Sequence, residues 1–127
     1  MKKFLGCTIG AGLLAMAAVP ASAHFSEAMF QAKESTVTGT VKDFQYMNPY
    51  AWLQVEAPGR DGKPTEWSFV TESPSQLERA GIKRNAVKKG EKVTLRVRPL
   101  KDGRPGGRLL SITTADGKVL TPPMPIG

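Results

Sequence analysis

The chain is short and basic: its 127 residues carry 18 Lys and Arg against 11 Asp and Glu, a formal net charge of +7. With one Cys and one His it lacks the side chains for a nucleophile, a base and a group that orients the base. Its acids form no paired-carboxylate cluster, and no Gly-rich loop precedes a Lys-Ser/Thr that would cradle phosphate. We therefore expect one small domain that is not an enzyme.

Residues 1–23 have the features of a secretory signal peptide. Two lysines precede an apolar stretch over 4–19, and Ala21-Ser22-Ala23 fits a small-x-small cleavage site. We expect cleavage between Ala23 and His24, a periplasmic or secreted protein, and no transmembrane segment in the mature chain. Two alternatives are a retained anchor, for which the apolar stretch is short, and lipidation of Cys7, which lies too early in the chain.

Cleavage would remove the only cysteine and leave His24, the only histidine, as the first residue. A free α-amino group beside an imidazole nitrogen can chelate Cu²⁺, which nitrogen ligands suit. The soft donors that could join it are Met29, Met47 and Met124, and no second histidine is available. Copper handling through His24 is therefore the alternative function, and no other cofactor is expected.

The mature chain opens with an N-terminal arm, 24–35, which is either a brief amphipathic turn or a loose segment. The first strand, 36–46, alternates apolar residues with threonines, the period of a β-strand. Gly39 within it suggests a bulge or a sharp bend. Met47-Asn48-Pro49 then makes a turn.

The second and third strands follow on either side of the turn 59–62. The second strand is expected to point Ala51, Leu53, Val55 and Ala57 inward. Its outward side chains are then Trp52, Gln54 and Glu56. The third strand has Thr65, Trp67 and Phe69 on its apolar face. This alternation is typical of strands with one buried face.

A short helix is expected next, because Ser73-Pro74-Ser75-Gln76 combines a Ser N-cap, Pro at the first helical position and a capping-box Gln. Leu77 and Ala80 should face inward, and Gly81 should end the helix. The fourth strand alternates Val93, Leu95 and Val97 with polar residues. A Gly-rich loop over 101–107 leads to a fifth strand from Leu110, and Asp116-Gly117 turns the chain into a short sixth strand. The barrel domain is expected to span 36–120, with a Pro-rich tail over 121–127.

Three strands, a helix and two further strands form the element order of the OB-fold. The sequence thus predicts a mainly β fold, a small five- to six-stranded OB-like antiparallel barrel with one short helix between strands three and four. A plain antiparallel sandwich could share the strand count, but the position of the capped helix favours the barrel.

A series of short motifs resembles an uncharacterised bacterial family of exported domains of unknown function. In chain order they are Thr38-Gly39-Thr40-Val41, Asn48-Pro49-x-x-Trp52, Trp67-x-Phe69 with Ser73-Pro74, Lys89-Gly90 before Val93, and Asp116-Gly117. The resemblance spans residues 24–120 and implies an OB-type barrel behind a signal peptide, with no established activity. Family members often begin with paired histidines and carry another after the Asn-Pro, where this chain has Phe25 and Tyr50.

Positive charge is concentrated late in the chain. Residues 79–108 contain eleven basic residues and two acids, and charge clustered in this way attracts polyanions. The alternative is a solvated face that keeps the protein soluble.

The candidate site combines aromatic residues near the first turn with arginines of strand four and the loop that follows it. OB-folds bind ligands across strands two and three and their flanking loops. The candidate ligand-binding residues are Tyr50, Trp52, Arg96, Arg98, Arg104 and Arg108. An anionic glycan, a lipid headgroup or an envelope protein is the expected partner, and nucleic acid, which stacks on such platforms, is not expected in this compartment. Local packing of the turn is the alternative role for Tyr50 and Trp52.

Overall fold

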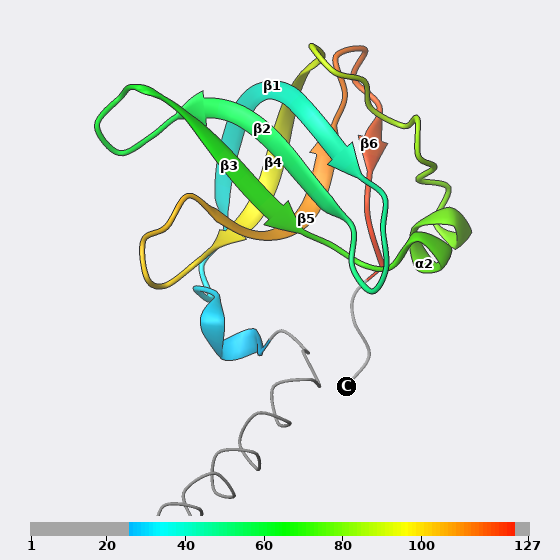
Figure 1. Cartoon of the computed structure of the whole chain (residues 1–127), viewed down its shortest axis with the longest axis horizontal. Coiled ribbons are helices and arrows are strands. Elements are labelled where there is room, and N and C mark those ends of the chain that lie inside the picture. The colour runs from blue at the N-terminus through cyan, green and yellow to red at the C-terminus, as the bar shows by residue number, and fades with distance from the viewer. Residues whose placement is uncertain (1–25, 124–127) are drawn as a thin grey trace, which may run out of the picture.

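The computed structural model describes residues 26–123, so the predicted signal peptide, His24 and Met124 lie outside the described residues (Figure 1). The elements within this range begin with a 3₁₀ helix and continue with a barrel. They are η3 (Glu27–Met29), β1 (Ser35–Gln45), β2 (Trp52–Pro58), β3 (Pro64–Val70), α2 (Pro74–Arg79), β4 (Lys92–Pro99), β5 (Gly106–Thr113) and β6 (Val119–Leu120). Within residues 26–123 no helix has the length and apolar character needed to cross a bilayer.

Strands β1 to β5 form a closed barrel, and β6 pairs with β5 outside it. The strand order β3-β2-β1-β4-β5 is closed by an additional pairing of β3 with β5. This confirms the predicted mainly β barrel with one short helix between β3 and β4. The barrel is mixed, because β3 and β5 run parallel while the other pairings are antiparallel. A closed ring of five strands cannot alternate direction at every pairing, so one parallel pair is unavoidable.

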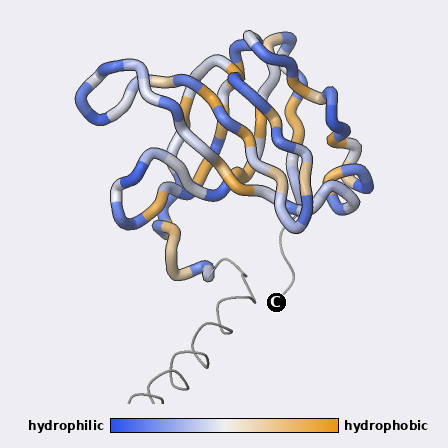
Figure 2. Tube along the Cα trace, in the orientation of Figure 1, coloured by the Kyte–Doolittle hydropathy of each residue, from blue (hydrophilic) through white to orange (hydrophobic). Residues whose placement is uncertain are grey.

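The core lies inside the barrel and follows the predicted alternation (Figure 2). The inward residues of β2 and β4 are buried: Leu53, Val55, Ala57, Val93, Leu95 and Val97. Phe69 of β3 and Ile112 of β5 join the same cluster. Burial of these apolar side chains is the main favourable contribution to folding.

A bulge at Gly39, one of the two alternatives expected there, and the predicted start of the fifth strand are wrong. The bulge lies at Lys42 rather than Gly39, because Val41 pairs with Val55 and Asp43 with Gln54. Gly39 has a different role: a Cβ there would lie 2.5 Å from the Glu56 carbonyl oxygen, so glycine permits the close approach of β1 and β2. The fifth strand begins at Gly106 rather than Leu110, and its extra residues pair with β3 and β4.

The predicted capping box is present at the start of α2. The Ser73 hydroxyl accepts from the Gln76 backbone N–H at 3.4 Å, and the Gln76 side chain accepts from the Ser73 N–H at 3.3 Å. The helix is only six residues long and buries Leu77 alone. Ala80, predicted to face inward, is exposed, because it is the C-cap of a helix that has already ended.

We expect Ser73→Ala to lower the free energy of unfolding by about 1 kcal/mol, the usual cost of losing an N-cap side chain. Urea denaturation of parent and variant measures the difference. Arg79→Gln, at an exposed position at the other end of the helix, serves as the control and should change stability by less than about 0.5 kcal/mol. Equal losses in the two variants would contradict a capping role for Ser73.

The described part of the N-terminal arm lies across one end of the barrel. Ser26 caps η3, and Phe30 forms a β-bridge with Leu100. The Gln31 N–H donates to the Pro99 carbonyl at 2.8 Å, and the Lys101 N–H donates to the Met29 carbonyl at 2.9 Å. Phe30 is only 2% exposed, so residues 26–31 are packed against the barrel rather than loose.

Candidate functional site

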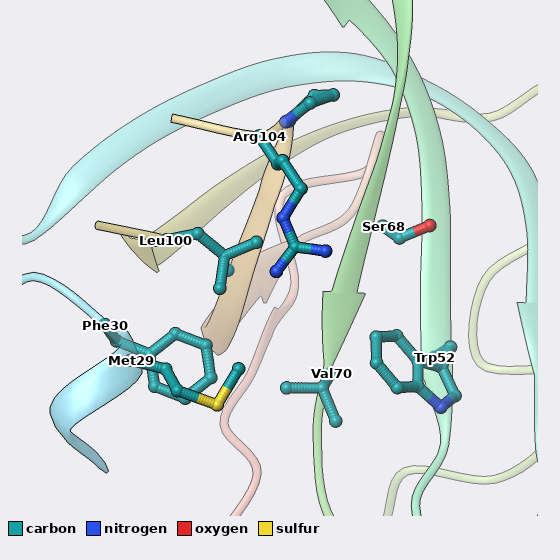
Figure 3. A pocket seen from close by; sticks show the side chains of 9 residues that line it. Met29, Phe30, Trp52, Ser68, Val70, Leu100 and Arg104 are labelled. Atoms are coloured by element: carbon teal, nitrogen blue, oxygen red, sulfur yellow. The ribbon is translucent and has the colours of Figure 1, made fainter. Parts of the chain in front are cut away.

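A cavity of about 340 Å³ lies on the outer face of β2 and β3, under the N-terminal arm and the β4–β5 loop (Figure 3). Its lining comes from four segments that are distant in the sequence: the N-terminal arm, β2, β3 and the stretch 100–107. The lining residues are Met29, Phe30, Trp52, Ser68, Val70, Leu100, Arg104, Pro105 and Gly107. Most of these side chains are apolar, and Arg104 supplies the charged group.

The strands place three side chains of the cavity next to one another. Trp52 pairs with Val70 across β2 and β3, and Ser68 precedes Val70 on the same outward face. Val70 is 1% exposed although it points away from the barrel interior. Met29 and Phe30 lie on one side of it and Trp52 on the other in the same cavity (Figure 3).

Arg104 enters the cavity from the β4–β5 loop. The Asp102 carboxylate accepts from the Arg104 backbone N–H at 3.0 Å and from its Nε at 2.7 Å. The backbone hydrogen bond is the main cause that lowers the pKa of Asp102, so its carboxylate is ionised over a wider pH range. Figure 3 shows the Arg104 guanidinium extending between Leu100 and Ser68 into the cavity. Asp102 therefore positions Arg104, and the terminal nitrogens of the Arg104 guanidinium face the cavity.

Of the six predicted ligand-binding residues, Trp52 and Arg104 line this cavity together. Tyr50 lies in the β1–β2 loop and is not among the lining residues. Arg96 is exposed and pairs with Glu34. The Arg96 guanidinium thus forms an ion pair at the surface and does not line the cavity.

Arg98 and Arg108 attach other segments to the barrel. Arg98 donates to the Gln31 carbonyl at 2.9 Å and to the Glu27 carboxylate at 2.5 Å. Arg108 is 6% exposed and pairs with Glu72, which is 4% exposed. The second Glu27 oxygen lies 3.9 Å from Arg108. These two arginines therefore hold the N-terminal arm in the position where it forms one wall of the cavity.

Sequence reasoning missed most of the apolar lining. The sequence does indicate that Ser68 and Val70 point outward, because they alternate along the strand with the inward Trp67 and Phe69. The sequence around Met29 and Phe30 gives no such indication, since no local pattern shows that the N-terminal arm folds back over β3. Leu100 is positioned by the same arm through its bridge to Phe30.

The metal hypothesis rests on residues beyond the described range. His24 and Met124 lie outside it, and within residues 26–123 no group of three or more His, Cys, Asp and Glu could hold a metal ion. Met29 lines the cavity, whereas Met47 is exposed on the β1–β2 loop.

Comparison with known families decides which proteins this barrel is related to. The profile of a family described as "Family of unknown function (DUF6152)" matches residues 11–109, well over half of the chain. The chain belongs to this family. No curated protein and no solved structure matches the chain.

The DUF6152 match contains the whole cavity. It covers β1 to β4 and the first residues of β5, and so includes every lining residue from Met29 to Gly107. Strand β6 lies beyond its end. The expectation of a small barrel from a family of unknown function is thus confirmed, while export stays a prediction.

Proposed function

We propose that the protein is an exported, non-enzymatic binding module whose cavity takes a small ligand with an apolar body and one anionic group. The observation that carries the proposal is that Trp52 and Arg104 line the same mostly apolar cavity. Its volume of about 340 Å³ falls in the range of about 300–1,000 Å³ that is usual for small-molecule sites. Apolar walls with a few polar groups are also their usual composition.

The chemistry of the lining indicates the class of ligand. Met29, Phe30, Trp52 and Leu100 would cover an aromatic ring or a short acyl chain, because removing apolar surface from water is favourable. A planar guanidinium binds carboxylate, phosphate or sulfonate through two parallel hydrogen bonds. Arg104 would therefore select ligands that carry such a group at the end facing the β4–β5 loop.

Export is proposed from the features of residues 1–23, and the absence of catalysis from the composition of the chain that follows. After cleavage the chain would have no cysteine and one histidine. Mass spectrometry of the protein recovered from an expressing bacterium should find His24 at the N-terminus. A chain that still begins with Met1 in the envelope fraction would contradict cleavage.

Two dyes test the cavity, since the natural ligand is unidentified. We expect 8-anilinonaphthalene-1-sulfonate, which has an aromatic body and one sulfonate, to bind the processed protein with enhanced fluorescence. Arg104→Gln should weaken this binding about 10-fold or more, as expected for a lost charged hydrogen bond. N-phenyl-1-naphthylamine has the same body without the charge, and its affinity should change little. Trp52→Ala should weaken both dyes.

Arg96→Gln is the matched control, because it removes the same charge at an exposed position outside the cavity. The near-UV circular dichroism of each variant must equal that of the parent, since the sulfonate dye also binds loosely packed states. The proposal fails if the parent binds neither dye. It also fails if Arg104→Gln and Arg96→Gln weaken sulfonate binding equally.

A further inference from the structure

Ten of the eleven cations in the basic run 79–108 fall into two groups with different surroundings; the eleventh, Lys101 of the β4–β5 loop, belongs to neither. Four arginines in the second half of the run pair with acids: Arg96 with Glu34, Arg98 with Glu27, Arg104 with Asp102, and Arg108 with Glu72. The six cations of 79–92 form no ion pair with any residue in the described range, and neither does Lys118 of the β5–β6 turn. We call the unpaired group the basic surface: Arg79, Lys83, Arg84, Lys88, Lys89, Lys92 and Lys118.

The loop that carries most of the basic surface is held to the barrel at both ends. At its start, Ile82 is buried and its carbonyl accepts from the Tyr46 hydroxyl at 2.7 Å. The Arg84 guanidinium lies over the Tyr46 ring, 5.2 Å from the centroid. Burial is the main cause that raises the pKa of Tyr46, so its hydroxyl stays protonated as a donor. The cations near the start of the loop are thus presented from a fixed backbone.

The other end of the loop is fixed by Glu91. Its carboxylate accepts from the Lys88 N–H at 3.1 Å and from the Ala115 N–H at 3.0 Å. Val87, between the two ends, is buried. Loop and β6 meet at a groove of about 310 Å³ that Lys83, Asn85 and Lys118 help to line. The basic surface is therefore continuous from the loop to β6.

The acids near this surface do not balance it. They are Glu78, Glu91 and Asp116, against seven cations, which leaves four net positive charges. Residues 26–123 as a whole carry five net positive charges. The Asp116 carboxylate accepts from the Thr114 hydroxyl, which is the main cause of its lowered pKa, and also from the Lys118 N–H. Nearly all of the excess charge of the domain thus lies on one side of it.

Exposed apolar side chains flank the same surface. In the described range the large hydrophobic residues that are exposed are Met47, at 48%, and Val119, at 61%. Val119 follows Lys118 directly, and Met47 follows the Tyr46 whose ring lies against Arg84. Cations with apolar neighbours suit the boundary between headgroups and acyl chains of a bilayer. A soluble polyanion would make use of the cations alone.

We propose that the basic surface docks the protein on a membrane surface rich in anionic phosphate headgroups. Lys and Arg near such a surface each add to the attraction, and Met47 and Val119 would enter the interface beside them. The surface lies on the α2 and β6 side, whereas the β2–β3 turn and the β4–β5 loop lie at the opposite side (Figure 1). Docking would therefore leave the β4–β5 loop, which carries Arg104, directed away from the bilayer.

Vesicle co-sedimentation tests the proposal with the processed protein. We expect binding to phosphatidylglycerol–phosphatidylcholine vesicles that decreases with salt, and little binding to pure phosphatidylcholine. Lys83→Gln/Lys88→Gln/Lys89→Gln should reduce the affinity about fivefold per cation, or roughly 100-fold in all. Lys33→Gln/Lys63→Gln/Lys101→Gln is the control, because these exposed lysines lie outside the basic surface. Parent and variants share the same residues ahead of Ser26, so any contribution from that segment cancels in the ratio.

The apolar contribution separates a bilayer from a soluble polyanion. Met47→Ser/Val119→Thr should weaken vesicle binding several-fold and leave heparin binding unchanged. Equal losses in the two lysine triple variants would overturn the proposal, since net charge alone would then explain binding. So would binding to heparin without binding to anionic vesicles. Dye binding in the cavity is independent of all these outcomes, so failure here leaves the proposed function standing.

Discussion

Arg108→Met is expected to lower the free energy of unfolding by about 3–5 kcal/mol, the usual result of removing one partner of a buried ion pair. Glu72 would be left without its counterion at 4% exposure. Glu27 cannot compensate, because it carries the same sign of charge. The loss comes from the carboxylate that stays buried rather than from the intrinsic strength of the pair. Guanidinium denaturation followed by far-UV circular dichroism measures it.

The double variant Glu72→Met/Arg108→Met distinguishes this cause from simple loss of packing. It removes both charges and should be more stable than Arg108→Met alone, because no unpaired charge remains buried. Arg96→Met, which breaks an exposed pair with Glu34, should cost at most about 1 kcal/mol. A double variant less stable than Arg108→Met and than Glu72→Met would mean that each side chain stabilises the fold through its own packing, and would contradict the unpaired charge as the cause.

Arg108 also illustrates what local sequence can and cannot predict. The alternation in β2 and β4 predicts which side chains enter the core, because each strand has one buried face. It cannot show that Arg108 is buried, since its partner Glu72 follows another strand. From the sequence alone, Arg108 cannot be distinguished from the other arginines of the basic run. The closure of the barrel through β3 and β5 brings Arg108 to Glu72, and the unpaired cations of the α2–β4 loop have no such partner in the described range.

The candidate site shows the same division between local and long-range information. Trp52 is predictable from the outward phase of β2, and Arg104 from its place in a loop that OB-folds use for binding. Tyr50 is adjacent to Trp52 in sequence yet is not among the residues that line the cavity. The wall made by Met29 and Phe30 depends on Glu27, which reaches Arg98 and Arg108 across the fold. Long-range ion pairs therefore complete a cavity whose strand-borne residues are locally encoded.

Gly107→Ala should be as damaging as the loss of Arg108, although it adds a single methyl group. Gly107 pairs with Phe69 of β3 and with Pro99 of β4, at the point where β5 closes the barrel. A Cβ there would lie 2.8 Å from the Pro99 Cα and would collide with the Arg98 carbonyl. Both obstacles are backbone atoms that cannot rotate away, so β4 and β5 must separate. We expect a loss of about 3 kcal/mol or more, at the upper end of overpacking effects, measured by thermal and denaturant unfolding.

Gly117→Ala separates this steric cause from the conformational cost of replacing glycine. Gly117 has a φ of +90° and nothing within 4 Å of an added Cβ, so the substitution should cost only about 1–2 kcal/mol. Gly107 also lines the cavity, so separation of β5 from β4 would displace the wall that carries Arg104 and Pro105. Gly107→Ala should therefore weaken binding of both dyes even where the variant is still folded, and Gly117→Ala should leave it unchanged. Equal stability losses with intact dye binding in both variants would show that the closure between β4 and β5 can relax.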